Sequence, residues 1–120
     1  TSLAATSEAL AMGVKAGLEP DIMLEAIQAG TGRNAATDLV IPENVLSRSF
    51  DFGATIEILL KDVNLALEEG ENQGVPQFVC QQTRQMLLLA AHKGWRQKDL
   101  SEWSKLVEEW AGVKITSSGN

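Results

Sequence analysis

The 120-residue sequence has few of the side chains that build common catalytic and metal sites. It contains one histidine, His92, one cysteine, Cys80, and no tyrosine. One cysteine and one histidine cannot supply the usual ligand set of a zinc site, so we expect no metal. A single cysteine also cannot close an intramolecular disulfide, which is typical of a reducing compartment. The sequence therefore favours a cytoplasmic location.

Long hydrophobic runs are also missing. The longest apolar run, Met86 to Ala91, is far shorter than the roughly 20 residues that span a bilayer as a helix. The first residues lack the positive charge, apolar core and small-residue cleavage site of a signal peptide. We therefore expect no membrane partner.

Positive charge is scarce and scattered. The chain has 16 acidic and 10 basic residues, which gives a formal net charge of -6. Phosphate contacts need clustered Lys and Arg, but the basic residues between Lys93 and Lys98 are few and are separated by Gly94 and Trp95. We therefore expect no nucleic-acid partner.

Hydrophobic periodicity predicts an all-α fold, since no alternation typical of strands is present. Proline and glycine suggest the breaks, and Pro42 should interrupt the third helix. The predicted helices cover residues 2–17, 20–30, about 35–40, 55–70, 77–92 and about 99–110. We expect a single bundle-like domain of five to six helices over residues 1–112, followed by a loose polar tail at 113–120.

The predicted helix over residues 55–70 has two apolar faces. Its core face contains Ile56, Leu59, Leu60, Val63 and Leu67, whereas Ile58 and Leu65 lie almost opposite. A helix that is apolar on two sides must be covered on two sides. The Ile58–Leu65 stripe thus predicts either a central position in the bundle or a surface that a missing partner covers, and it favours self-association.

The last two helices also have predicted inward faces. For residues 77–92 these side chains are Phe78, Val79, Met86, Leu87 and Ala90. For the final helix they are Trp103, Leu106, Val107 and Trp110. Cys80 follows two of these positions, so we interpret it as an inert packing residue.

Lys61 and Asp62 form the most suggestive polar pair. Spacing alone favours a surface ion pair between Glu57 and Lys61 at i,i+4, which contributes only about 0.3–0.5 kcal/mol. The alternative is that Lys61 points a cation toward a bound carboxylate or cofactor beside the second apolar stripe. The residues by themselves leave both interpretations open.

A glycine-containing turn is the second candidate. The segment from Gly30 to Asn34 follows a predicted helix rather than a strand, so it is not a dinucleotide-binding fingerprint. The simplest interpretation is a helix end and a turn. Two glycines, Arg33 and Asn34 within five residues are also suited to close approach by a ligand.

Six short motifs follow one another along residues 1–112. They are Ser7-Glu8-Ala9-Leu10, Lys15 to Pro20, Gly30 to Arg33, Phe52 to Ala66 with Lys61-Asp62, Gly74-Val75-Pro76, and Gly94 to Ser101. In this order and with this spacing, they resemble the C-terminal helical domain of the β-hydroxyacid dehydrogenases, the group that contains 3-hydroxyisobutyrate dehydrogenase and tartronate semialdehyde reductase.

The resemblance implies a two-domain, homo-oligomeric enzyme. In that family a Rossmann domain binds NAD or NADP, and the active site lies in the cleft between it and the helical domain. The reaction is reversible hydride transfer between a small β-hydroxyacid and its semialdehyde. By resemblance Lys61 faces the cofactor, Asp62 accompanies it, and Arg33 and Asn34 lie where some members place substrate-contacting loop residues.

The resemblance also implies what this chain lacks. The family's catalytic lysine lies near the start of a connecting helix, at a position before Thr1, and the Rossmann domain precedes that helix. We therefore expect that the chain alone contains no catalytic residue, binds no cofactor and is inactive. The alternative is a stand-alone helical interaction module whose Ile58–Leu65 stripe binds a partner helix.

Overall fold

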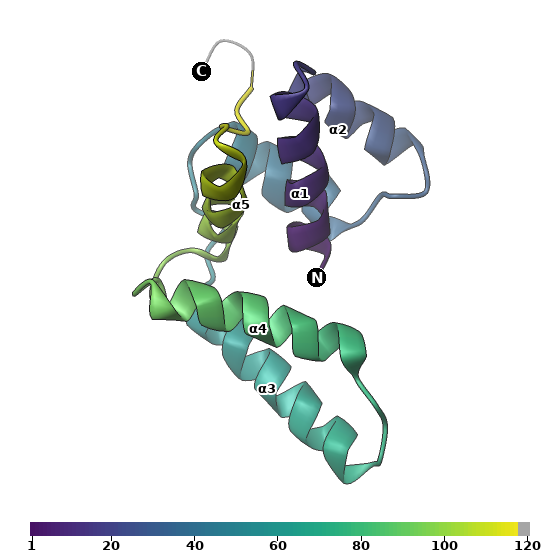
Figure 1. Cartoon of the computed structure of the whole chain (residues 1–120), viewed down its shortest axis with the longest axis vertical. Helices are drawn as coiled ribbons and strands as arrows, with labels where there is room; N and C mark the ends of the chain where they lie inside the picture. The colour runs from purple at the N-terminus through teal and green to yellow at the C-terminus, as the bar shows by residue number, and fades with distance from the viewer. Residues whose placement is uncertain (118–120) are drawn as a thin grey trace. The chain divides into compact units, whose positions relative to one another are not determined.

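The computed structural model describes residues 1–117, and these fold into helices joined by loops (Figure 1). Within this range, the only extended pairing is an isolated bridge between Thr55 and Asp99. The all-α prediction is therefore confirmed. The helical segments are α1 (Ser2–Lys15), α2 (Pro20–Ala29), the π-helical η1 (Ala36–Leu46), α3 (Ile56–Asn72), α4 (Phe78–His92), the 3₁₀ turn η2 (Leu100–Trp103) and α5 (Ser104–Ala111).

The expectation of a single bundle needs correction, because the helices form two compact units. Residues 53–100, together with Thr1, make one unit, which we call the hairpin unit. Residues 2–52 and 101–117 make the other, which we call the core unit. In the hairpin unit α3 packs on α4, whereas in the core unit α1 packs on α2, η1 and α5.

The predicted breaks around the second helix are confirmed. Gly17 adopts φ +93°, a conformation that stops α1 and that other residues rarely adopt. Pro20 then opens α2, where its missing N–H is not needed, even though Glu19 makes no side-chain capping bond. Gly30 follows the last residue of α2.

The prediction that Pro42 interrupts the third helix is wrong. The helix continues through Pro42 as η1, with the wider π winding. In that winding the N–H of residue 42 would bond to the carbonyl of Thr37, and proline has no N–H to give. The side-chain amide of Gln28 donates to this carbonyl instead, at 2.7 Å, so the buried backbone group is satisfied.

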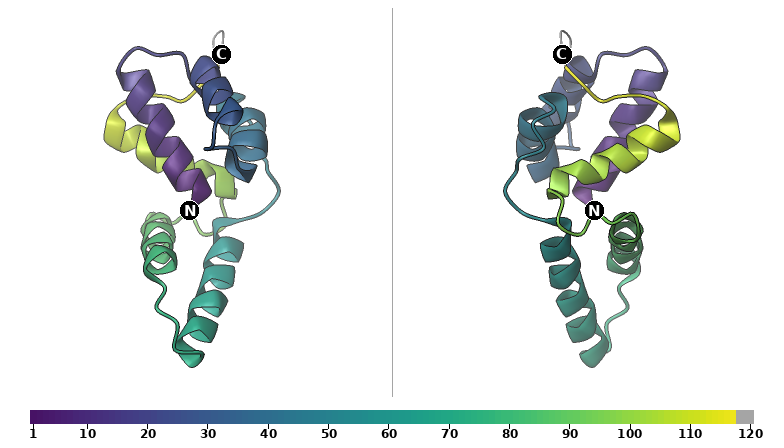
Figure 2. Two further views of the ribbon diagram at one scale, coloured as in Figure 1. Left: turned by 90° about the vertical axis from the view of Figure 1, so that its right-hand side faces the viewer. Right: turned by 90° about the vertical axis from the view of Figure 1, so that its left-hand side faces the viewer.

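The hairpin unit is a pair of antiparallel helices (Figure 2). Thr55 caps α3 by accepting the N–H of Ile58 at 3.2 Å. The segment after α4 returns to the same helix end, where the carbonyls of Lys98 and Arg96 accept the N–H groups of Ile56 (3.0 Å) and Glu57 (2.9 Å). The free amides at the start of α3 are thus largely paired.

Burial confirms part of the predicted core. On α3, Ile56, Leu60 and Leu67 are buried, while Ile58 and Leu65 are exposed, as the two-face pattern predicted. Leu87 and Ala90 of α4 are buried, and so are Trp103, Leu106 and Val107. Cys80 is only half-buried.

Three predicted core residues are wrong. Phe78, Val79 and Trp110 are 84%, 63% and 58% exposed, respectively. The side of α4 that packs on α3 is centred on Leu87, so Phe78 at the first position of α4 lies about half a turn away. Trp110 is near the end of α5 and meets Trp103 only edge-on, with ring centroids 6.5 Å apart.

The predicted loose tail is also wrong as far as Ser117. Ile115 is fully buried, and the N–H of Ser117 donates to the carbonyl of Leu46 at 3.1 Å. Residues 118–120 of the predicted tail lie outside the described residues.

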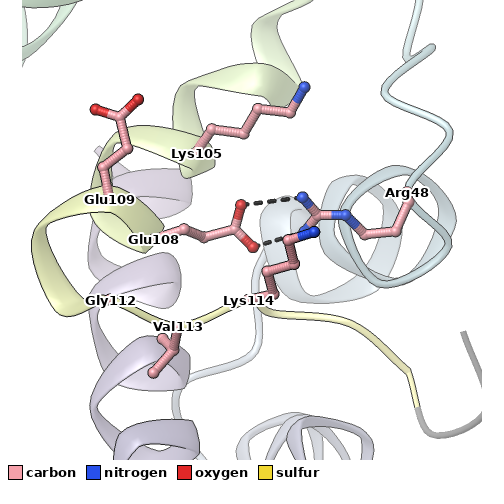
Figure 3. Close-up of a pocket in the computed structure, with 7 residues that line it drawn as sticks. All are labelled: Arg48, Lys105, Glu108, Glu109, Gly112, Val113 and Lys114. Atoms are coloured by element: carbon pink, nitrogen blue, oxygen red, sulfur yellow. Dashed lines mark hydrogen bonds and ion pairs between the residues drawn. The ribbon is translucent and has the colours of Figure 1, made fainter.

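A partly buried ion pair holds this C-terminal segment in the core unit (Figure 3). The two terminal nitrogens of Arg48 bond the two carboxylate oxygens of Glu108 at 2.6 and 3.1 Å. The Glu108 carboxylate also accepts the N–H of Ile115 at 2.6 Å. A groove of about 490 Å³ beside this pair contains none of the predicted site residues. Among residues 1–117, no helix has the length and apolar character needed to cross a membrane.

Candidate functional site

Lys61 lies on α3 in a groove of about 360 Å³ within the hairpin unit. The groove runs between α3 and α4 and ends at the segment that follows α4. Its polar lining consists of three cations and two carboxylates with one amide: Lys61, Arg84, Arg96, Glu57, Glu68 and Asn64. Leu60, Leu65 and Leu88 supply the apolar part of the lining.

The surface ion pair expected between Glu57 and Lys61 is not formed. Arg96 takes its place, with its terminal nitrogen 2.8 Å from a Glu57 carboxylate oxygen. Lys61 is exposed and makes no hydrogen bond or ion pair with any residue among 1–117. Its ammonium group is therefore available to an anionic ligand, which supports the second interpretation of Lys61.

The sequence analysis missed Arg84 and Asn64. The Nε of Arg84 donates to the side-chain oxygen of Asn64 at 2.6 Å, which fixes the guanidinium at the groove. Asn64 is three residues after Lys61, so helical spacing was a usable signal for it. Arg84 is on a different helix, and only the packing of α4 on α3 brings it there.

Asp62 lies next to Lys61 in sequence but not in the groove lining. Successive helical residues are about 100° apart, so the two side chains leave α3 in different directions. Asp62 is exposed, and it has no bonding partner among the described residues. A role in substrate binding stays a prediction for this residue.

Arg33 and Asn34 belong to the core unit, directly before η1. Arg33 bonds Asp38 at 2.8 Å, and this hydrogen bond together with the charge of Asp38 raises the pKa of Arg33. The Asn34 side chain accepts the N–H groups of Ala36 (2.7 Å) and Thr37 (3.2 Å) and donates to the carbonyl of Gly32 (2.8 Å). Asn34 thus caps the start of η1. Substrate contact stays a prediction for both residues.

The chain resembles known dehydrogenases along most of its length. A family model described as "NAD-binding of NADP-dependent 3-hydroxyisobutyrate dehydrogenase" matches residues 1–107. The 2-(hydroxymethyl)glutarate dehydrogenase of Eubacterium barkeri is 31% identical over 115 residues, which cover 96% of this chain and 38% of the relative. The NAD-dependent L-serine dehydrogenase of Pseudomonas aeruginosa is 27% identical over 113 residues, which cover 89% of this chain and 38% of the relative.

A solved structure supports the same fold. The crystal structure of 3-hydroxyisobutyrate dehydrogenase from Salmonella typhimurium aligns with a TM-score of 0.71 at 20% identity, over 87% of this chain and 36% of that one.

The architecture is therefore the helical architecture found in dehydrogenases of this kind. The chain belongs to the 3-hydroxyisobutyrate dehydrogenase NAD-binding family. It spans 38% of the length of the Eubacterium barkeri relative, so it corresponds to one part of such a protein.

Proposed function

We propose that this chain is the C-terminal helical domain of an NAD(P)-dependent enzyme that interconverts a small β-hydroxyacid and its semialdehyde. Membership of the family over residues 1–107 and relatives much longer than the chain support this proposal. The remainder of the protein would then contain the Rossmann domain, the catalytic lysine and the main cofactor-binding surface. The enzyme would work in the cytoplasm, and the isolated chain would be inactive.

The observation that links the proposed function to a particular residue is the unpaired ammonium of Lys61. The groove beside it combines cations with apolar side chains, and this donor set suits a carboxylate or phosphate group. The bound nicotinamide would supply or accept the hydride. Lys61 would bind and orient an anionic group of the cofactor or substrate, and Asp62 would act from the neighbouring side of α3.

The arginines of the groove have a different role from Lys61. Arg96 is neutralised by Glu57, and Arg84 is held by Asn64, so both guanidinium groups are fixed in place by α3. Arg84 adds positive potential near Lys61 while it keeps its bond to Asn64, whereas the charge of Arg96 is offset by Glu57. Lys61 is thus the residue whose charge a ligand would neutralise.

The test is Lys61→Ala in the full-length protein. Removing a charge-assisted hydrogen bond costs about 1.5–3 kcal/mol, so kcat/KM should fall by roughly 10- to 150-fold. Steady-state kinetics with NAD and NADP and a panel of β-hydroxyacids measure the change. Lys61→Arg keeps the charge and should retain part of the activity.

Lys15→Ala is the matched control, because Lys15 is an exposed lysine in the last turn of α1. It should leave kinetics unchanged. Equal kcat/KM values for Lys61→Ala and Lys15→Ala would show that Lys61 does not bind the substrate or the cofactor.

One observation favours the alternative of a helical interaction module. Ile58 and Leu65 are 50% and 56% exposed on α3, so an apolar stripe is available to a partner helix. The reading frame upstream of this chain separates the two functions. A Gly-rich strand–turn–helix fingerprint there supports the dehydrogenase, whereas its absence supports the module.

A further inference from the structure

A second groove, of about 490 Å³, lies within the core unit (Figure 3). Its walls come from the loop after η1, from α5 and from the segment that follows α5. Gly112 turns the chain between the last two with φ +72°, a left-handed conformation that ends α5. The volume falls in the range of small-molecule sites, which makes this groove a candidate for a second ligand.

The loop that carries Arg48 into this groove has an unusual backbone conformation. Arg48 and Phe50 have φ values of +65° and +46°, which residues other than glycine rarely adopt. Asn44 holds the loop, because its carbonyl accepts the N–H of Phe50 at 3.0 Å and its side-chain oxygen accepts the N–H of Asp51 at 3.1 Å. Arg48 and Lys105 both lie over the Phe50 ring, 4.7 and 4.2 Å from its centroid. Strained conformations that are fixed in this way cluster beside ligand sites.

The cations of this groove differ in how their charges are compensated. Arg48 is paired with Glu108 at 2.6 and 3.1 Å, and Lys105 is paired with Glu102 at 2.9 Å. Lys105 uses only one of its three N–H donors for that pair. Lys114 is exposed and makes no hydrogen bond or ion pair with any residue that the structure describes. Lys114 is therefore the cation whose charge an anionic ligand would neutralise.

The rest of the lining indicates which anion fits. The groove contains three cations and two carboxylates, Glu108 and Glu109, so its formal charge is a single positive one. It also lies at the C-terminal end of α5, where the helix dipole is negative. Both features disfavour a dianion such as a phosphate monoester, whereas one carboxylate matches the charge. Val113 and the aliphatic part of the Lys114 side chain offer apolar contact to the body of the ligand.

We propose that this groove binds a small organic monocarboxylate. Lys114 bonds the carboxylate group, Lys105 is its second donor, and the apolar body lies on Val113. The Arg48–Glu108 pair stays closed and forms a fixed wall. This site is independent of the proposed dehydrogenase function, because it shares no residue with the groove beside Lys61.

The test is a titration of the full-length protein with benzoate, a monocarboxylate with a flat apolar body, followed by ligand-observed NMR. We expect saturable binding with Kd in the millimolar range, because ion pairs near the surface are weak. A hydrogen bond to a charged group is worth a factor of about 10 or more, so Lys114→Ala should raise Kd by about 10-fold. Benzamide, the neutral analogue, should bind the wild-type protein no more tightly than benzoate binds Lys114→Ala.

Two lysine variants are the controls. Lys15→Ala removes an exposed lysine of the same unit and should leave Kd unchanged. Lys61→Ala should also leave it unchanged, which separates this groove from the candidate site on α3. Hydrogen exchange gives a second readout: saturating benzoate should slow exchange in residues 113–117, because the ligand ties Lys114 to α5.

Three results would overturn the proposal. Absence of saturable benzoate binding to the wild-type protein means that the groove holds no monocarboxylate. Equal Kd values for Lys114→Ala and Lys15→Ala mean that benzoate binds elsewhere, and a loss of binding in Lys61→Ala would place it in the groove on α3. Displacement of benzoate by an equal concentration of inorganic phosphate means that the groove does not select a single carboxylate. None of these results changes the kinetic test of Lys61.

Discussion

The core unit and the hairpin unit bury their side chains to very different degrees. In the core unit Leu10, Ile41, Val45 and Ile115 have no exposed surface, and Leu106 is 1% exposed. In the hairpin unit only Ile56 and Ala90 are fully buried, although α3 and α4 are the two longest helices. Two helices enclose only the strip between them, whereas the four helices of the core unit surround a volume.

The two units also differ in where their polar and apolar groups lie. The hairpin unit contains Lys61 with its groove and the exposed side chains of Ile58, Leu65 and Phe78. The core unit contains the Arg48–Glu108 pair, whose groups bond each other and the backbone. The core unit also exposes large apolar side chains, among them Met12, Ile22 and Trp110, so the two units differ in how completely they bury their cores rather than in whether they expose apolar surface.

The test with the largest expected effect replaces one leucine in each unit. Leu106→Ala should lower the local free energy of unfolding by about 4 kcal/mol, because Leu106 is almost completely buried on α5, which packs on α1, and a cavity there cannot be filled by solvent-side relaxation. Leu60→Ala should cost only about 2 kcal/mol, because Leu60 already borders the open groove and its neighbours can relax. Native-state hydrogen exchange of α5 and α3 measures the two losses. Equal losses would mean that the two units are packed equally well.

The second test removes the charge from the buried pair of the core unit. Glu108→Gln leaves Arg48, which is only 25% exposed, without its counter-ion. Breaking a buried pair costs up to 3–5 kcal/mol, and partial exposure of Arg48 should reduce the loss to about 2 kcal/mol. Faster amide exchange should be confined to residues 113–117 and α5.

Glu25→Gln changes the net charge equally at an exposed position of α2 in the same unit and should have little effect. If both variants weaken protection to the same degree, general charge rather than the pair holds the C-terminal segment.

The sequence was sufficient where local rules decide the structure. Gly17 and Pro20 mark helix ends through backbone geometry, and the spacing of Ile56, Leu60 and Leu67 identifies a core face. Pro42 misled the prediction because the Thr37 carbonyl, which the missing N–H of Pro42 leaves without its helical partner, accepts a hydrogen bond from Gln28 on another helix. No pattern within residues 35–46 contains that information.

The candidate site shows the same division between local sequence rules and contacts made by distant segments. Family resemblance in the Lys61-Asp62 motif singled out Lys61, whose role stays a prediction, but helical spacing assigned Glu57 to the wrong cation. Arg96 forms the ion pair with Glu57 because the segment after α4 folds back onto the start of α3. Phe78 and Val79 were predicted inward because apolar residues are usually buried, but both lie in the first turn of α4 and are exposed.

The test with the smallest expected effect changes the charge at the end of α3 in the hairpin unit. The last turn of α3 contains no basic residue, and Glu71 there is exposed. A carboxylate near the negative end of a helix dipole is unfavourable, so Glu71→Lys should stabilise α3 by about 0.3–1 kcal/mol and Glu71→Gln by roughly half as much. Hydrogen exchange of the amides in α3, at 20 mM and 500 mM salt, measures the gain. It should shrink at high salt because the groups are exposed and screened. The core unit should not respond, and an equal gain in α1 and α5 would show that the two units share one stability rather than two.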